Sequence, residues 1–221
     1  MKVALLGKGK TGGKVLELLL EKKIPHTVFD SQNKPCLEKL SGHDVVISFL
    51  SGEVFFTYAD LLITSKIPVV TGSTGVPWPE NFDKKLQTPW IFATNFSLGM
   101  NLIQQMILIM KNADKLLSDY HFSLHEIHHT KKLDSPSGTA LSWKKWAGHE
   151  MEITSERIGD VPGIHEITLT TKTEKISLKH EALDRKIFAE GAIYAAKKIK
   201  TLSPGLHLFQ DVVQASLLQG H

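Results

Sequence analysis

The first half of the chain alternates short, continuous apolar runs with longer stretches whose apolar residues recur at helical spacing. Continuous runs bounded by glycine or other turn residues predict buried parallel strands, and apolar residues three and four positions apart predict amphipathic helices. The predicted strands span residues 3–6, 26–29, 44–49, 67–71 and 90–94, and the predicted helices contain residues 15–20 and 54–65. This alternation is typical of a doubly wound α/β fold.

The second half of the chain follows a different pattern. A broad apolar face over residues 98–117 predicts a long helix, and partial alternation over residues 120–128 predicts a strand. Ser135 and Pro136 are typical of a helix start, with Ser135 as the N-cap, and predict a helix over about residues 137–150. The remaining predicted elements are a loop at 157–163, a strand hairpin at 164–171 and 175–180, and helices at 185–200 and 209–218.

A glycine-rich loop lies between the first predicted strand and the first predicted helix. It reads Gly7-Lys8-Gly9-Lys10-Thr11-Gly12, the Gly-x-Gly-x-x-Gly spacing of dinucleotide-binding folds. In such folds the glycines let the backbone approach a pyrophosphate at the helix N-terminus. Asp30 ends the second strand about 20 residues further on, where an acid contacts a ribose hydroxyl. The alternative is a plain tight turn, with Asp30 capping a loop.

The charges around Asp30 bear on the choice of cofactor. Its carboxylate would repel the 2′-phosphate of NADP and therefore favours NAD. Three lysines could offset that repulsion, namely Lys8, Lys10 and Lys34. We expect NADH or NADPH, with a modest preference for NADH.

Two further loops of small and polar residues follow predicted strands. Residues 71–75 read Thr-Gly-Ser-Thr-Gly, and residues 95–99 read Asn-Phe-Ser-Leu-Gly. Open α/β sheets bind ligands at the carboxyl ends of their strands, so both loops are candidate walls of a cofactor cleft. The alternatives are a plain turn for the first loop and a domain hinge for the second.

Residues 126–140 hold the candidate chemistry. His128 and Lys132 are proton donors beside a Pro-Ser-Gly-Thr turn, and Gly138 and Thr139 would bind an anion such as a carboxylate at the helix start. Neighbouring histidines on a strand point to opposite faces, and further ligands at metal spacing are lacking, so we expect no metal. The alternative for the adjacent histidines is that one is hydrogen-bonded in the core and the other is in solvent.

Composition narrows the class of protein. With 42% hydrophobic and 22% charged residues among 221, we expect a compact, soluble fold without a membrane partner. The net charge of +3, with acids and bases interleaved, argues against a nucleic-acid partner and suits a small anionic ligand. Cys36 is the only cysteine, which excludes an internal disulfide and favours a cytoplasmic location. The apolar segments predict neither a signal peptide nor a membrane span.

Six spaced motifs resemble the 4-hydroxy-tetrahydrodipicolinate reductase family of lysine biosynthesis, also called dihydrodipicolinate reductases. The most specific is Glu-x-His-His-x-x-Lys-x-Asp-x-Pro-Ser-Gly-Thr-Ala, which begins at Glu126. The others are Gly-x-Gly-Lys-x-Gly-Gly from residue 7, Thr-Gly-Ser-Thr-Gly from 71, Ala-x-Asn-Phe-Ser-x-Gly from 93, Arg-x-Gly-x-Val-Pro-Gly from 157 and Arg-x-x-Phe-Ala-x-Gly-Ala from 185.

The resemblance implies a Rossmann-like dinucleotide-binding domain over residues 1–97 and 190–221. It implies a second α+β domain with an open mixed sheet over residues 98–189, which binds substrate and assembles a homotetramer. The implied reaction is NAD(P)H-dependent reduction of 4-hydroxy-tetrahydrodipicolinate to tetrahydrodipicolinate on the diaminopimelate route to lysine, by hydride transfer to ring C4 with acid-assisted loss of water. The alternative is a regulatory or redox-sensing Rossmann protein that binds NAD(P) without turnover.

The resemblance also implies residue roles. His128 corresponds to the general acid/base and Lys132 to a second proton donor. His129 corresponds to a substrate contact, and Gly138 with Thr139 to the clamp on a ring carboxylate. The implied cofactor contacts are Gly7, Lys8, Gly9, Lys10, Thr11, Gly12, Asp30, Gly72, Ser73, Thr74, Ala93, Thr94, Asn95 and Phe96.

The chain departs from the family pattern at residues 48–52. It reads Ser-Phe-Leu-Ser-Gly where the family has Asp-Phe-Ser or Asp-Phe-Thr with a proline soon after, which leaves the nicotinamide-side contacts there open. Asp30 lacks the arginine that often follows in members using both cofactors, which adds to the preference for NADH. Arg185 and Phe188 match a family motif as cleft residues without an assigned role.

Overall fold

The chain folds into two compact units in the computed structural model, which describes residues 1–218. The first unit contains Met1–Leu98 and the chain from Arg185 onward, and the second contains Gly99–Asp184. Each unit has its own sheet and its own hydrophobic core.

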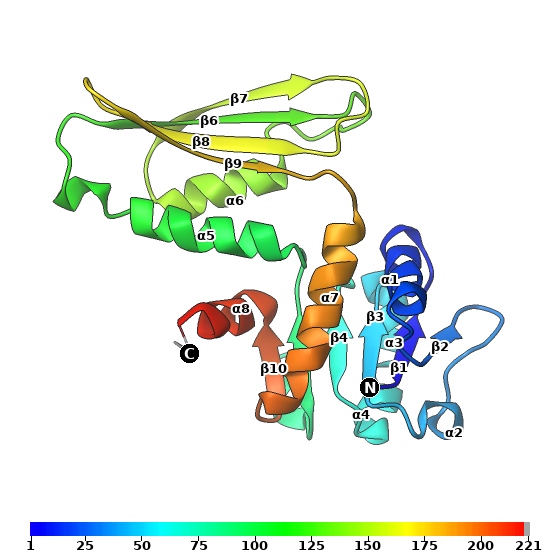
Figure 1. The fold of residues 1–221 in the computed structure, drawn as a ribbon. Helices are drawn as coiled ribbons and strands as arrows, with labels where there is room; N and C mark the ends of the chain where they lie inside the picture. Colours follow the sequence, from blue (N-terminus) through cyan, green and yellow to red (C-terminus); the bar gives the residue numbers. More distant parts are fainter. Residues whose placement is uncertain (219–221) are drawn as a thin grey trace. The chain divides into compact units, whose positions relative to one another are not determined.

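The first unit is built on a six-stranded sheet in which all paired strands are parallel (Figure 1). Every residue of its three central strands is buried, as expected for a parallel sheet covered on both faces. The strands, in order across the sheet, are β10 (Gly205–Leu208), β5 (Pro89–Phe92), β4 (Val69–Thr71), β3 (Val45–Ser48), β1 (Val3–Leu6) and β2 (His26–Phe29).

Helices cover both faces of this sheet. They are α1 (Lys10–Glu21), α2 (Leu37–Leu40), α3 (Gly52–Thr57), α4 (Ala59–Ser65), α7 (Lys186–Lys198) and α8 (Phe209–Leu218), with 3-10 turns at Phe82–Lys85 and Ile199–Thr201. Successive side chains of β1 point to opposite faces. Val3 and Leu5 pack in the core formed with α1 and α7, and Ala4 and Leu6 pack in the core formed with α3 and α4.

The order of strands along the chain reverses beside β1. β2 pairs with one side of β1 and β3 pairs with the other, so the loops that leave β1 and β3 diverge at the carboxyl ends of these strands. Open α/β sheets bind ligands at such a reversal. The topology therefore presents the glycine-rich loop after β1 and residues 49–51 after β3 at the expected ligand position.

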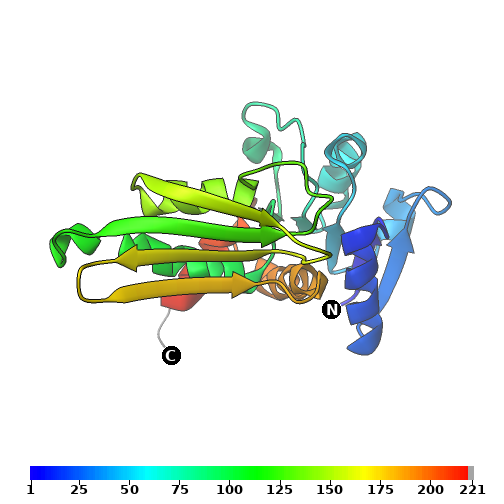
Figure 2. The same ribbon diagram turned by 90° about the horizontal axis from the view of Figure 1, so that it is seen from above.

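The second unit is a four-stranded mixed sheet with two helices on one face (Figure 1). β7 pairs parallel to β6, and the other pairs are antiparallel, in the order β7-β6-β8-β9. Figure 2 looks onto the opposite face, which no helix among the described residues of this unit covers. The elements are α5 (Leu98–Met110), a 3-10 turn (Ala113–Lys115), β6 (His121–His128), α6 (Gly138–Ala147), β7 (Met151–Arg157), β8 (Ile164–Thr170) and β9 (Lys175–Glu181).

Alternate residues of β6 face the helices. Phe122 and Leu124 are buried in the core with Trp143 of α6. Glu126 and His128 continue the same buried face toward the carboxyl end of the strand. The strand periodicity therefore places a carboxylate and an imidazole inside the unit.

Two strands were absent from the sequence prediction, and both are edge strands. β7 alternates in burial, but Ser155 and Arg157 occupy inward positions and hide the apolar period. β10 has four residues, is only partly buried, and contains Gly205 and His207. A short or polar edge strand carries too few apolar residues to stand out in a sequence.

The predicted single helix over residues 54–65 is wrong, because two helices meet at Tyr58. Tyr58 N–H donates to Phe55 O at 3.0 Å, and the Thr57 hydroxyl donates to Val54 O at 2.7 Å. These tighter bonds close α3 before α4 begins. The helix predicted over residues 98–117 likewise ends at Met110 and continues as a separate 3-10 turn.

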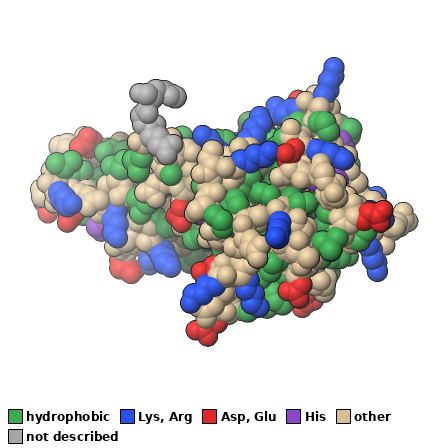
Figure 3. All heavy atoms as spheres, turned by 90° about the horizontal axis from the view of Figure 1, so that it is seen from below, with side chains coloured by type: hydrophobic (Ala, Val, Ile, Leu, Met, Phe, Trp, Pro, Cys, Tyr) green, Lys and Arg blue, Asp and Glu red, His purple; other side chains and the backbone are tan. Residues whose placement is uncertain are grey.

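No helix in the described part of the chain is long and apolar enough to span a bilayer. Figure 3 shows acidic and basic side chains interspersed over one face of the molecule. This distribution agrees with the small net charge of +3.

Gly191→Ala is expected to destabilise the first unit. A Cβ at Gly191, inside α7, would overlap the carbonyl oxygen of Phe96. Alanine normally favours a helix interior by roughly 0.5–1 kcal/mol over glycine, but overpacking against backbone costs about 1–3 kcal/mol. Urea unfolding should therefore show a lower midpoint. The matched control is Gly13→Ala in α1, whose Cβ would lie 3.6 Å from Lys8 O and should leave or raise the midpoint. Equal effects of the two substitutions would contradict this packing.

Candidate active site

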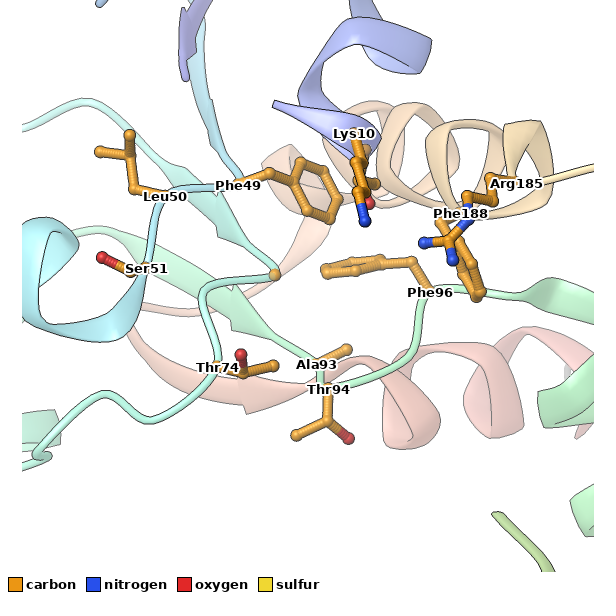
Figure 4. A pocket seen from close by; sticks show the side chains of 12 residues that line it. Lys10, Phe49, Leu50, Ser51, Thr74, Ala93, Thr94, Phe96, Arg185 and Phe188 are labelled. Atoms are coloured by element: carbon orange, nitrogen blue, oxygen red, sulfur yellow. The ribbon is translucent and has the colours of Figure 1, made fainter. Parts of the chain in front are cut away.

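The first unit contains a pocket of about 440 Å³ at the carboxyl ends of its parallel strands (Figure 4). Figure 4 shows Lys10 and Arg185 on one side of the pocket, Thr74 and Thr94 on the other, and the Phe96 ring between them. The lining residues are Lys10, Thr11, Phe49, Leu50, Ser51, Gly72, Thr74, Ala93, Thr94, Phe96, Arg185 and Phe188.

The glycine-rich loop brings the start of α1 to this pocket. Gly7 has φ +87°, and a Cβ at Gly12 would overlap the carbonyl oxygen of Gly7, so the tight turn requires glycine at both positions. Gly9 is the N-cap of α1 and provides no side-chain cap for the first N–H groups. Lys10 and Thr11, the first helical residues, line the pocket. Free N–H groups and an ammonium suit the pyrophosphate of a dinucleotide.

Lys8 and Asp30 form an ion pair, with Lys8 Nζ 2.8 Å from Asp30 Oδ2. Asp30 Oδ1 accepts hydrogen bonds from the N–H groups of Asn33 at 3.0 Å and Gln32 at 2.9 Å. The Lys8 ammonium and these N–H groups lower the pKa of Asp30 to about 2. At neutral pH, the end of β2 therefore presents a carboxylate with a cation already beside it.

The structure brings half of the expected cofactor residues together around the pocket. Those in its lining are Lys10, Thr11, Gly72, Thr74, Ala93, Thr94 and Phe96. Those outside the lining are Gly7, Lys8, Gly9, Gly12, Asp30, Ser73 and Asn95. Ser73 is buried, with its hydroxyl 3.4 Å from that of Ser48, and Asn95 Oδ1 accepts from Ser97 N–H at 2.8 Å. Ser73 and Asn95 therefore shape the loops that form the pocket walls.

Five lining residues had no role assigned from sequence. Phe49, Leu50 and Ser51 follow β3 as the glycine-rich loop follows β1, so their position after a strand was an available signal. The Phe49 ring packs edge-to-face with the Phe96 ring, at a centroid distance of 5.8 Å. Arg185 and Phe188, which the family motif marked as cleft residues without a role, enter this pocket from a segment distant in sequence.

The second unit has a separate polar cluster around a fully buried carboxylate, Glu126. The strand register sets Ser155 of β7 and His165 of β8 directly beside it. Oε1 accepts from Ser137 N–H at 2.9 Å and Ser155 Oγ at 2.9 Å, and Oε2 accepts from Ser137 Oγ. Arg157 Nη2 lies 3.4 Å from Oε1. Four donor groups therefore surround one carboxylate.

These donors keep Glu126 ionised. Burial alone would raise the pKa of its carboxyl. The hydrogen bonds from Ser137 and Ser155, together with the charge of His128, outweigh burial and hold the pKa below its ordinary value. Glu126 is therefore a buried anion at neutral pH.

Two histidines face the Oε2 atom of Glu126. His128 Nδ1 lies 3.6 Å from it and His165 Nε2 lies 3.5 Å from it, and the two rings meet edge-to-face. Burial lowers the pKa of His128, opposed by Glu126 and reinforced by Lys132 and Arg157. Burial and the neighbouring His128 lower the pKa of His165 to about 4. The Nδ1 atoms of both histidines are buried without a hydrogen-bond partner among residues 1–218.

The loop after β6 enters α6 through a capped helix start. Ser137 is the N-cap, and its Oγ accepts from Ala140 N–H at 3.2 Å. The prediction of Ser135 as the cap is wrong, because Ser137 is the residue whose side chain reaches a free N–H of the first turn. Gly138 and Thr139 follow as the first helical residues, and a Cβ at Gly138 would meet no atom within 4 Å.

Lys132 and His129 occupy the same loop. Lys132 Nζ lies 2.8 Å from Asp134 Oδ1, and this ammonium holds the pKa of Asp134 below its ordinary value. The carbonyl oxygen of His129 accepts from Lys132 N–H at 3.1 Å, and the His129 side chain is half-buried. The charge of the Lys132 ammonium also contributes to lowering the pKa of His128, so the loop holds this ammonium close enough to act on the imidazole.

Glu126, His128 and His165 place one ligand atom each within 4.8 Å of one another, a grouping that could hold a metal ion. The expectation that further ligands were lacking missed His165. The pairing of β6 with β8 brings His165 opposite Glu126 and beside the ring of His128. The carboxylate already accepts four hydrogen bonds, one of them from the Arg157 guanidinium. This donor set neutralises the carboxylate internally and disfavours a cation beside it.

The sequence motif identified His128 but not the groups that enclose it. A Cβ at Gly163, in the loop between β7 and β8, would lie 3.2 Å from His128 Nε2. Gly163 and His165 therefore confine the imidazole, as Ser155 and Arg157 confine the carboxylate. The pairing of β7 and β8 with β6 was needed to see this.

Stability should fall as pH decreases from about 6.5 toward 4, because the pKa of His165 is about 4 in the folded chain and its ordinary value is 6.5. Between these pH values, His165 binds a proton in the unfolded chain but stays neutral in the folded chain, so protonation favours unfolding. Urea unfolding at pH 4.5, 5.5 and 6.5 should show a smaller slope for His165→Gln than for wild type. His121→Gln, which changes an exposed histidine of the same sheet, is the control and should keep the wild-type slope. Identical slopes for wild type and His165→Gln would contradict the prediction.

Comparisons with known proteins agree with this architecture. Residues 99–213 match the family model described as dihydrodipicolinate reductase, C-terminus. The chain is 33% identical to the 4-hydroxy-tetrahydrodipicolinate reductase of Thermosipho africanus over 200 residues, which cover 90% of this chain and 84% of that protein. It is 32% identical to the enzyme of the same name from Christiangramia forsetii, covering 96% of this chain and 98% of that protein.

A solved structure shares the fold. The dipicolinate-bound dihydrodipicolinate reductase of Paenisporosarcina sp. TG-14 superposes with a TM-score of 0.77 at 20% identity, covering 96% of this chain and 99% of that one. The predicted fold class, with a Rossmann-like unit and a second unit with a mixed sheet, is confirmed. The chain belongs to the 4-hydroxy-tetrahydrodipicolinate reductase family of nicotinamide-dependent oxidoreductases.

Proposed function

We propose that the chain reduces 4-hydroxy-tetrahydrodipicolinate to tetrahydrodipicolinate with NAD(P)H, on the diaminopimelate route to lysine. Family membership supports this proposal, and one observation carries it. A buried imidazole beside a carboxylate, next to a capped helix start, occurs in the same chain as a pocket suited to a dinucleotide. A proton donor, an anion site and a dinucleotide pocket are the parts that such a reduction needs.

The first unit is proposed to bind the cofactor and the second to bind substrate. The family resemblance predicted domain boundaries at residues 97–98 and 189–190, and the two compact units divide at residues 98–99 and 184–185. The bound cofactor supplies a hydride. The proposed contacts are the glycine-rich loop from Gly7 to Gly12, Asp30, and the loops Gly72 to Thr74 and Ala93 to Phe96. Lys10 and the first N–H groups of α1 are suited to hold the pyrophosphate.

In the second unit, His128 is the proposed general acid/base and Lys132 the second proton donor. Loss of water breaks the C4–O bond, with His128 donating a proton to the departing hydroxyl, and removes a proton from the adjacent ring carbon. C4 then accepts the hydride, and Lys132 donates a proton to the adjacent carbon. In sum, the substrate takes up one hydride and one proton and releases one water. Gly138 and Thr139 hold a ring carboxylate at the start of α6, and His129 contacts the substrate.

The cofactor preference is proposed to lie modestly toward NADH. Asp30 presents a full negative charge near the ribose position and would repel a 2′-phosphate. Lys8 offsets part of that charge, since its ammonium is 2.8 Å from the carboxylate. NADPH should therefore also serve as a cofactor.

A cytoplasmic homotetramer is proposed, assembled through the sheet of the second unit. Among the described residues of the second unit, no helix covers the sheet face opposite α5 and α6 (Figure 2). It carries polar pairs such as His125 with Thr154 and Thr168 with Ser177, both at 2.9 Å. Light scattering should give four times 24.6 kDa. A monomer mass at micromolar concentration would overturn the assembly.

The activity is tested by mixing the chain with the freshly formed condensation product of pyruvate and aspartate semialdehyde. Absorbance at the reduced nicotinamide band should fall with NADH, and more slowly with NADPH. Binding of NADH without oxidation would instead favour a regulatory protein. Lack of oxidation with both cofactors would overturn the reductase assignment.

His128→Ala and Lys132→Ala are expected to lower kcat by about 10²- to 10⁴-fold, the usual contribution of general acid catalysis. The Kd for NADH should stay within about twofold, because both residues belong to the second unit and the dinucleotide pocket to the first. Stopped-flow turnover and fluorescence titration measure the two quantities. An equal loss of cofactor affinity would refute the assignment of roles.

Lys8→Ala should strengthen the preference for NADH. Without the ammonium beside Asp30, a 2′-phosphate would meet an uncompensated carboxylate, and the affinity for NADPH should fall by about fivefold relative to NADH. The ratio of kcat/KM for the two cofactors measures the effect. Lys14→Ala, which removes a lysine paired with Glu17 on the same helix, is the matched control and should leave the ratio unchanged. An unchanged ratio in Lys8→Ala would show that Lys8 does not contribute to selection.

A further inference from the structure

We infer that Glu126 is a positioning residue that couples the proton donor His128 to the start of α6. One buried carboxylate would then set both the orientation of the imidazole and the place of the Gly138–Thr139 anion site. This inference rests on the function proposed above. It assigns a role to a buried charged group that the proposed chemistry does not otherwise use.

The two oxygens of Glu126 have different surroundings. Oε1 is held by Ser155 Oγ, by Ser137 N–H and by the nearby guanidinium of Arg157. Oε2 faces the candidate chemistry, with Ser137 Oγ as its donor and the rings of His128 and His165 at 3.6 and 3.5 Å. Oε1 therefore anchors the carboxylate, and Oε2 is the oxygen that can act on His128.

Glu126 fixes the start of α6 through Ser137. The backbone N–H and the hydroxyl of Ser137 both donate to the carboxylate, and the same hydroxyl accepts from Ala140 N–H. Ser137 immediately precedes Gly138, the first residue of the proposed clamp. A displaced carboxylate would therefore shift the N-cap of α6 and the clamp residues that follow it.

Glu126 also selects the form of the His128 ring. A carboxylate beside Nδ1 favours a proton on that nitrogen and leaves Nε2 free to exchange a proton with substrate, as in other carboxylate–imidazole pairs. His128 Nδ1 is buried, and the carboxylate oxygen Oε2 of Glu126 lies 3.6 Å from it. The other charged or titratable groups that act on His128 come from the loop, β7 and β8, and are Lys132, Asp134, Arg157 and His165.

The effect of neutralising Glu126 has a definite sign. The carboxylate favours protonated His128, whereas Lys132 and Arg157 disfavour it. Glu126→Gln removes the favourable charge and keeps the shape, so the pKa of His128 must fall. If His128 acts as the acid, the descending limb of the pH profile of kcat/KM must then move to lower pH. Above the pKa, each unit of decrease leaves about tenfold less protonated imidazole.

The resting protein provides the first test. Histidine side-chain NMR titration of wild type and Glu126→Gln, with His128 identified by its loss in His128→Asn, should place the His128 midpoint at lower pH in Glu126→Gln. Glu126→Asp keeps the charge but withdraws it by one methylene, so its midpoint should fall between the two, and it carries the test if Glu126→Gln does not fold. An unchanged His128 midpoint in the folded variant would overturn the inference. Since no turnover is needed, this result is independent of the proposed function.

Kinetics provide the second test. Glu126→Gln should lower kcat by about tenfold or more, raise KM for the dicarboxylate substrate, and leave the Kd for NADH unchanged. Ser155→Ala is the matched control, because it removes a donor from Oε1 only and should leave the His128 midpoint in place. If Glu126→Gln and Ser155→Ala lose kcat equally and neither shifts the pH profile, Glu126 has only a structural role and the inference is overturned. Failure of wild type itself to oxidise NADH would instead overturn the proposed function.

Discussion

A carboxylate removed from water must be surrounded by donors, and this constraint organises the second unit. Glu126 is fully buried, and an isolated buried charge costs several kcal/mol unless hydrogen bonds and opposite charges replace its hydration. Its donors come from β7 and from the start of α6, and two imidazoles face it from β6 and β8. Loss of register by one residue on β6 would turn this carboxylate to the outer face, so the site depends on correct pairing of the whole sheet.

The pocket of the first unit is built from different kinds of groups. Its pocket has few charges, and it uses the free N–H groups of α1, the close packing of Gly7 against Gly12, and aromatic walls. These features suit a large ligand with a pyrophosphate and flat rings. A hydride supplied by such a ligand explains why the second unit needs proton donors and an anion site but no nucleophile.

Much of the fold followed from periodicity. Continuous apolar runs marked the central parallel strands, because a strand covered on both faces leaves little room for polar residues. The edge strand β7 was missed because polar side chains occupy inward positions, and β10 because it has four residues and is only partly buried. The cap of α6 was misplaced by two residues, since both serines fit the pattern and only the hydrogen bond to Ala140 distinguishes them.

The candidate site was predictable only where its residues are close in the chain. His128, Lys132, Gly138 and Thr139 fall in one stretch and were predicted together. His165 and Arg157 are both more than 30 residues away from Glu126 along the chain, and strand pairing brings them to it. In the first unit, the family motif marked Arg185 and Phe188 as cleft residues, and the fold shows which pocket they line.

Transfer of deuterium tests the central claim most directly. The chain is incubated with the condensation product of pyruvate and aspartate semialdehyde and with NADH deuterated at C4, in separate experiments for each face of the nicotinamide. Mass spectrometry and NMR of the product should show deuterium at ring C4 of tetrahydrodipicolinate with one of the two deuterated forms of NADH and not with the other. Product without deuterium from both, or no product at all, would contradict hydride transfer to this substrate.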